Sequence, residues 1–64
     1  MMSSKFKEIV GKAYNDYLKK GFGSHPPSEA LWLANEYVED NKGQPITEEG
    51  LYNAVYEGLV GTDF

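Results

Sequence analysis

The chain contains no cysteine and no arginine, and it has a single histidine, His25. Without cysteine it can form neither a disulfide nor a thiolate metal site, and one imidazole cannot build a histidine metal cluster or a conventional catalytic triad. No stretch approaches the roughly 18 consecutive apolar residues that a membrane-spanning helix needs. These absences argue against most enzyme classes. The sequence therefore predicts a non-enzymatic protein with no cofactor, no bound metal and no membrane segment.

The residues that are present suit one small folded unit. The 64 residues are 41% hydrophobic and 14% aromatic, which is too apolar for a disordered tail. A chain of this length supports a single domain, over residues 1–64, with a thin core, so a partner protein or a second copy in a homodimer is expected to add stability. Its beginning has no unbroken apolar segment of the roughly 7–15 residues found in secretory signals, so we expect a cytoplasmic protein.

Clusters of glycine and proline divide the chain into three segments in which apolar residues recur every three or four positions. The alternation typical of strands is missing. The sequence predicts helices over residues 4–20, 28–42 and 48–60, with Gly21 in the left-handed conformation that ends the first. The second begins either with a proline in its first turn or with Ser28 as N-cap, and Thr47 suits the N-cap of the third. We therefore predict an all-α fold, a small three-helix bundle.

Charge is distributed unevenly along the chain. Residues 1–23 contain five lysines and two acidic residues, a balance of +3, whereas residues 24–64 contain one lysine and eight acidic residues, a balance of −7. The first helix is therefore basic, and the other two are acidic. An excess of acidic residues is often only a solubility feature, but an acidic surface also complements a basic patch on another protein, such as a nucleic-acid channel.

Trp32 breaks the amphipathic pattern of the second helix. On a helical wheel it lies about 180° from the apolar face that contains Ala30 and Tyr37. One interpretation is that the second helix is central and buried on both sides, with the indole covered by residues of the chain ends, Met1, Met2 or Phe64. The other is an interface, because tryptophan is enriched in binding hot spots, where its truncation costs about 2 kcal/mol or more.

The candidate protein-binding residues combine this tryptophan with the acidic side chains and a tyrosine of the second and third helices: Trp32, Glu36, Glu39, Asp40, Glu48, Glu49, Tyr56 and Glu57. An alternative is a nucleic-acid-binding module that uses lysines of the first helix spaced by seven: Lys5, Lys12 and Lys19. The absence of arginine, which supplies the bidentate contacts of base readout, argues against nucleic acid as the partner. A further alternative is a self-assembling structural unit.

Two known binding motifs, a calcium-binding loop and a DNA-binding helix-turn-helix, do not fit this sequence. The segment over residues 39–50 superficially resembles a calcium-binding EF-hand loop, but Gln44 and Gly50 stand where such a loop needs a glycine and a bidentate glutamate. The second and third helices do not suit a DNA-binding helix-turn-helix, because their connection is long and the acidic third helix would repel phosphates.

The sequence therefore favours a small acidic regulator or inhibitor that binds another protein through its second and third helices. Its size and charge are typical of accessory proteins of phages and mobile elements. In one version of this hypothesis the acidic surface imitates nucleic acid and acts as a decoy for a host protein.

Overall fold

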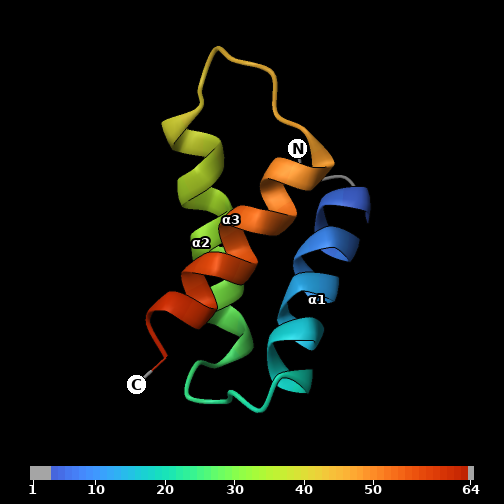
Figure 1. Cartoon of the computed structure of the whole chain (residues 1–64). Coiled ribbons are helices and arrows are strands. Elements are labelled where there is room, and N and C mark those ends of the chain that lie inside the picture. Colours follow the sequence, from blue (N-terminus) through green and yellow to red (C-terminus); the bar gives the residue numbers. More distant parts are fainter. Residues whose placement is uncertain (1–3, 64) are drawn as a thin grey trace.

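The structure, a computed structural model, describes residues 4–63, which form three α-helices and no strand (Figure 1). The helices are α1 (Ser4–Lys19), α2 (Pro27–Asp40) and α3 (Glu48–Gly61). All three are in mutual contact, so the predicted all-α three-helix bundle is confirmed. Each helix begins and ends within two residues of its predicted range.

Local signals decide where the helices begin and where α1 ends. Gly21 has a φ of 96°, a left-handed conformation that favours glycine, and it follows α1 as predicted. Pro27 is the first residue of α2, so this helix begins with a proline in its first turn and Ser28 is not its N-cap. Thr47 is the N-cap of α3, because its hydroxyl accepts a hydrogen bond from the Gly50 N–H at 2.9 Å.

The end of α2 comes two residues earlier than predicted. The backbone N–H of Asn41 donates to the Tyr37 carbonyl at 3.1 Å, and its side-chain amide donates to the same oxygen at 2.8 Å. Asn41 thereby caps the helix after Asp40, before the left-handed Gly43, whose φ is 86°. The local hydrogen bonds of Asn41 therefore set the end of α2, and the spacing of apolar residues gives no sign of them.

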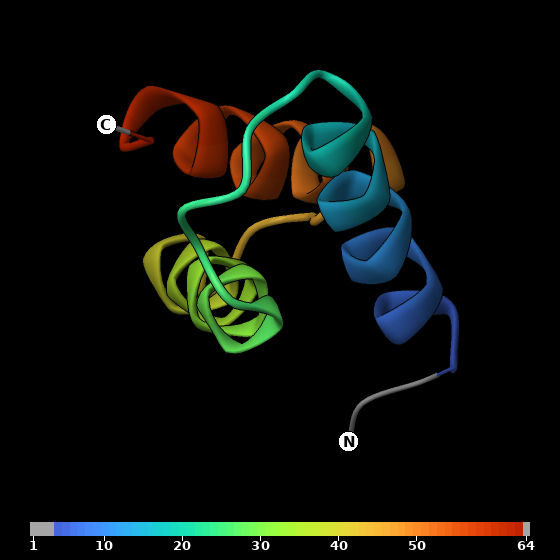
Figure 2. The same ribbon diagram turned by 90° about the horizontal axis from the view of Figure 1, so that it is seen from below.

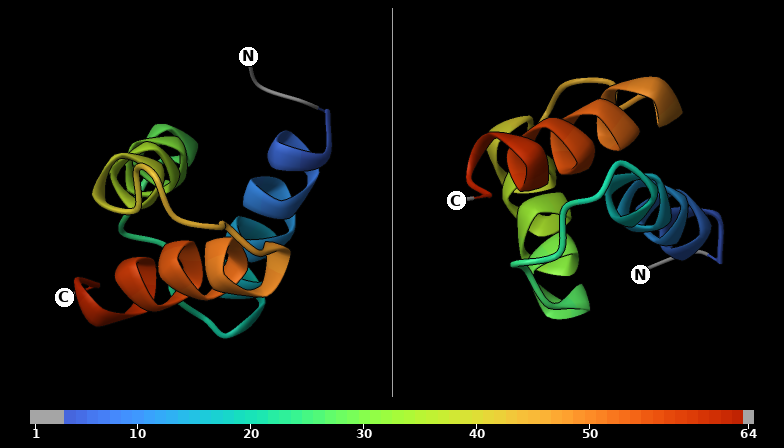
Figure 3. Two further views of the ribbon diagram at one scale, coloured as in Figure 1. Left: turned by 90° about the horizontal axis from the view of Figure 1, so that it is seen from above. Right: turned by 60° about the horizontal axis from the view of Figure 1, so that its bottom comes forward.

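The central helix is α3, which corrects the interpretation that the second helix lies in the middle. Both α1 and α2 pack mainly on α3 and less on each other, and Figures 2 and 3 show them together on one side of it. The side of α3 that they cover carries Leu51, Val55 and Leu59, spaced by four. The other buried residues are Val10, Ala13, Tyr17, Ala30 and Ala34. Three of these eight side chains are alanines, so the core is thin.

Gly58 lets Leu33 of α2 pack directly against the backbone of α3. A Cβ atom at this position would lie 2.9 Å from Cδ2 of Leu33 and 3.0 Å from its Cδ1. The leucine therefore occupies the space that a side chain on α3 would need. Over residues 4–63, no helix has the length and apolar character needed to cross a membrane.

Candidate protein-binding surfaces

The outer face of α2 carries the tryptophan singled out in the sequence. Trp32 is 56% exposed, the highest value among the exposed large hydrophobic residues of the described chain. Glu36, Glu39 and Asp40 are also exposed, and within residues 4–63 none of these carboxylates forms an ion pair. We call Trp32, Glu36 and Glu39 the Trp32 face. The hypothesis that the chain ends cover the indole concerns residues outside those described: Met1, Met2 and Phe64.

The predicted residues of α3 do not all join this face. Glu48 lies on the side of α3 toward α1, where it pairs with a lysine. Tyr56 is half-buried and stacks on Tyr52 with ring centroids 5.8 Å apart. The remaining two are exposed on α3: Glu49 and Glu57. By helical spacing, the candidate residues on the same side of α2 as Trp32 are Glu36 and Glu39.

The three lysines proposed for nucleic acid are exposed on α1, and two of them contact carboxylates. Lys5 Nζ lies 3.7 Å from Glu48 Oε2, and Lys12 Nζ lies 3.3 Å from Asp16 Oδ2. Lys19 is in the last turn of α1, where a positive charge complements the helix dipole. Part of the positive charge of this stripe is therefore balanced within the chain.

A polar cluster ties the end of α3 to the loop after α1. The fully buried Tyr17 donates its hydroxyl to Asp63 Oδ2 at 2.6 Å and accepts the His25 N–H at 2.9 Å. The same carboxylate oxygen accepts the backbone N–H groups of Gly23 and Ser24, each at 3.2 Å. These hydrogen bonds lower the pKa of Asp63 to about 2, and the bond from Tyr17 makes the largest contribution. Tyr17 and Asp63 are 46 residues apart, so the sequence gives no sign of this cluster.

The single histidine belongs to the same end of the bundle. His25 Nε2 lies 2.8 Å from Thr62 Oγ1, and the Thr62 hydroxyl donates to the Gly58 carbonyl at 2.7 Å. Since the hydroxyl proton is already engaged, Thr62 accepts from His25, which places a proton on Nε2. The Tyr14 hydroxyl donates to the His25 carbonyl at 2.7 Å. His25 therefore holds the α1–α2 loop against the end of α3.

A second polar cluster joins the C-terminal half of α1 to α3. Tyr52 donates its hydroxyl to the Asp16 carboxylate, and Lys12 Nζ lies 5.7 Å from the centroid of the Tyr52 ring. The hydrogen bond to Asp16 raises the pKa of Tyr52 to about 12 and lowers the pKa of Asp16. Both clusters use their polar atoms to fix the helices relative to one another.

Acid is expected to destabilise the fold through Asp63 and Asp16. The pKa of Asp63 falls from an ordinary 3.8 to about 2, and the pKa of Asp16 shifts the same way. A carboxyl group with a lowered folded pKa contributes stability that is complete above its ordinary pKa and is lost as the pH falls through the folded value. Above pH 3.8, Asp63 should therefore cause no change of the thermal midpoint with pH. Between pH 3.8 and pH 2 its protonation should lower the midpoint.

Thermal unfolding followed by circular dichroism from pH 7 to pH 2 measures this dependence. Asp63→Asn should melt at a lower temperature than the wild type at neutral pH and lose less between pH 3.8 and 2. An acid-induced drop of the same size in both proteins would show that other carboxylates cause it.

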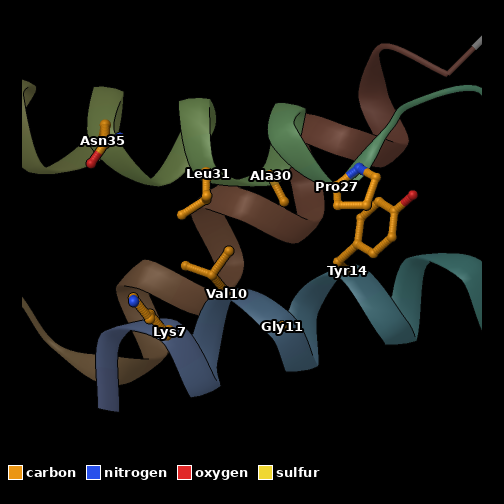
Figure 4. Close-up of a pocket in the computed structure, with 8 residues that line it drawn as sticks. All are labelled: Lys7, Val10, Gly11, Tyr14, Pro27, Ala30, Leu31 and Asn35. Carbon is orange, nitrogen blue, oxygen red and sulfur yellow. The ribbon is translucent and has the colours of Figure 1, made fainter. Parts of the chain in front are cut away.

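An apolar groove of about 450 Å³ lies between α1 and α2. Figure 4 shows α3 passing behind it, with Lys7 and Asn35 at one end and Tyr14 and Pro27 at the other. The middle is lined mainly by small or aliphatic residues: Val10, Gly11, Ala30 and Leu31. This groove could not be predicted from the sequence, because it depends on how far α1 and α2 lie apart.

Within the described residues, no group of three or more histidine or acidic side chains is placed to hold a metal ion. Comparison of the chain with protein-family models, with curated proteins and with solved structures finds no match. The surfaces of the chain itself must therefore indicate its function.

Proposed function

We propose that the protein is a small non-enzymatic regulator or inhibitor that binds another protein through the Trp32 face. The observation that carries this proposal is an indole that is 56% exposed beside glutamates with no ion-pair partner in residues 4–63. Apolar surface in contact with water is unfavourable, and a partner that covers it gains binding free energy. Tryptophan suits such a contact because it combines a large apolar ring with a polar N–H.

The charges beside the indole define the chemistry of the partner. Helix α2 contains four acidic residues and no basic one. A partner with an apolar pocket for Trp32 and a rim of lysine or arginine would complement both parts of the face. Attraction between opposite charges would speed association and make it sensitive to salt. A basic channel that otherwise holds nucleic acid is one surface of this kind, which is the decoy version of the proposal.

Trp32→Ala is expected to weaken partner binding by about 30-fold, the equivalent of the roughly 2 kcal/mol lost at a hot spot. The helical circular dichroism signal should be unchanged, because the side chain is exposed. Asn53→Ala, at an exposed position of α3, is the control and should bind like the wild type. The partner would be captured from the native cell with the tagged wild-type chain, identified by mass spectrometry, purified and titrated calorimetrically with each variant.

A double charge reversal, Glu36→Lys with Glu39→Lys, should slow association and reduce its dependence on salt. Partner binding that survives both Trp32→Ala and this reversal would show that the Trp32 face is not the binding surface. A mobility-shift assay with DNA tests the alternative: steeply salt-dependent binding that is lost on replacing the α1 lysines would favour a nucleic-acid-binding module.

A further inference from the structure

The groove between α1 and α2 is open and apolar along most of its length. At Gly11, no atom from beyond the local helix backbone lies within 4 Å of the position that a Cβ would take. Leu31, on the opposite wall, is 41% exposed, and Tyr14 and Pro27 continue the lining to one end (Figure 4). The volume of about 450 Å³ lies within the roughly 300–1,000 Å³ of pockets that hold small molecules. The groove can therefore hold the apolar part of a small molecule.

The other end of the groove carries a single charge. Among the described residues that line the groove, Lys7 alone is charged, and Asn35 lies at the same end on the facing helix (Figure 4). Lys7 is exposed, and within residues 4–63 it forms no ion pair. Glu39, one turn beyond Asn35 on α2, lies outside the groove. Because the ammonium and the amide both supply N–H donors, this end suits an anionic acceptor.

We infer that the groove binds a free monocarboxylate with a straight alkyl chain, the chemistry of a medium-chain fatty acid. The carboxylate lies at Lys7 and Asn35, and the alkyl chain runs past Gly11 toward Tyr14. One negative charge matches the one lysine of the lining, and a charged donor strengthens the hydrogen bond to the carboxylate. The alkyl chain covers Leu31 and so removes apolar surface from water. This inference does not depend on the proposed function.

The length of the groove sets the length of the alkyl chain. From Lys7 to Tyr14, α1 advances by about 10 Å, since each residue of a helix rises about 1.5 Å. An extended chain of about eight carbons spans this distance, because bonds of about 1.5 Å in a zigzag advance about 1.3 Å each. Leu18, which is 42% exposed, lies one turn beyond Tyr14 on the same face of α1 and can cover further carbons. Octanoate is therefore the reference ligand.

The test is titration of the whole ¹⁵N-labelled chain with octanoate at neutral pH, followed by NMR. The amide signals of Gly11 and Leu31 should shift and saturate with a Kd of about 1 mM, the affinity usual for so small a ligand. Octanol, which has no charge, should bind about tenfold more weakly, and octyltrimethylammonium should not bind. Shortening the acid to hexanoate should weaken binding about tenfold, because two methylenes leave the groove. Equal binding of the acid, the alcohol and the cation would overturn the inference.

Replacement of the lysine tests how the carboxylate is held. Lys7→Gln should weaken octanoate binding about tenfold and leave octanol binding unchanged, because only the charged contact is lost. Lys7→Arg retains the charge and should bind octanoate like the wild type. Lys19→Gln, which removes the same charge from α1 outside the groove, is the matched control and should also bind like the wild type. Undiminished octanoate binding by Lys7→Gln would overturn the assignment of the carboxylate to this end.

A second variant blocks the alkyl chain while preserving the fold. Gly11→Leu places an apolar side chain in the open wall and replaces a poor helix former with a good one. It should bind neither octanoate nor octanol, while its helical circular dichroism signal is retained. Trp32→Ala should bind octanoate like the wild type, because Trp32 lies outside the groove. Loss of octanoate binding in Trp32→Ala, or its survival in Gly11→Leu, would place the ligand elsewhere and overturn the inference.

Vesicles distinguish a free carboxylate from a membrane lipid, which also joins an anionic group to alkyl chains. The chain should not sediment with vesicles of phosphatidylglycerol, and these vesicles should not displace octanoate. Sedimentation with the vesicles that is lost in Lys7→Gln would assign the groove to a membrane surface and overturn the inference of a free ligand.

Discussion

Tyr17→Phe is expected to lower the free energy of unfolding by about 1–3 kcal/mol, the usual cost of leaving a buried polar group without its partner. The ring itself would stay in place, because it is fully buried and stacks on Phe22 with centroids 5.8 Å apart. The substitution removes only the hydroxyl, which donates to Asp63 and accepts from the His25 N–H. The missing oxygen therefore leaves the His25 N–H without its partner, and Asp63 loses one of the three donors on its Oδ2 atom.

For a domain of this size, 1 kcal/mol corresponds to a change of roughly 4–8 °C in the thermal midpoint, so the loss is readily measured by calorimetry. Tyr56→Phe is the matched control, since the Tyr56 hydroxyl makes no hydrogen bond within residues 4–63 and its loss should cost less than about 0.5 kcal/mol. Equal midpoints for the two variants would show that the Tyr17 hydroxyl contributes nothing. Tyr17→Phe combined with Asp63→Asn should cost less than the sum of the two changes, because both remove the same hydrogen bond.

Leu59→Ala is expected to have a larger effect, a loss of about 2–5 kcal/mol, as for other buried leucines. Leu59 is fully buried on the helix against which both α1 and α2 pack. A chain of this length has a total stability of only about 3–10 kcal/mol, so the variant should be near its unfolding midpoint in buffer at room temperature. The cavity would open in the thin core, where few large side chains are available to fill it.

Urea unfolding followed by circular dichroism measures this loss. Leu18→Ala makes the same chemical change at a side chain that is 42% exposed, and it should cost less than about 1 kcal/mol. A Leu59→Ala variant as resistant to urea as Leu18→Ala would contradict the central position of α3.

The helices were predictable from local signals. Gly21, Pro27 and Thr47 act through the backbone of their own turn, so their effects can be anticipated without the rest of the fold. The helical period placed Trp32 opposite the apolar face of its helix, but it left open whether the indole is covered or exposed. In the structure the indole is 56% exposed. Helix α2 ends two residues before the predicted boundary, because Asn41 donates both its backbone and its side-chain N–H to the Tyr37 carbonyl, which the spacing of apolar residues does not reveal.

The arrangement of the helices relative to one another was harder to predict from the sequence. Whether Glu48 and Tyr56 join the Trp32 face depends on which side of α3 turns toward α1. The amphipathic pattern of α3 does not fix the rotation of the helix about its own axis closely enough to predict this. The groove depends on the distance between α1 and α2, and the bond between Tyr17 and Asp63 depends on where two distant segments meet. Surface residues of single helices could therefore be predicted, while features shared between helices could not.

The central position of α3 has a consequence for how the chain folds as it is synthesised. Helices α1 and α2 leave the ribosome first, but each packs mainly on α3 and less on the other. Before Leu51, Val55 and Leu59 have emerged, Tyr17 and Ala34 have no core to enter. Isolated helices of 16 and 14 residues are only marginally stable in water. The nascent chain therefore stays largely unfolded until its third helix is free of the ribosome, and the bundle then forms in one step.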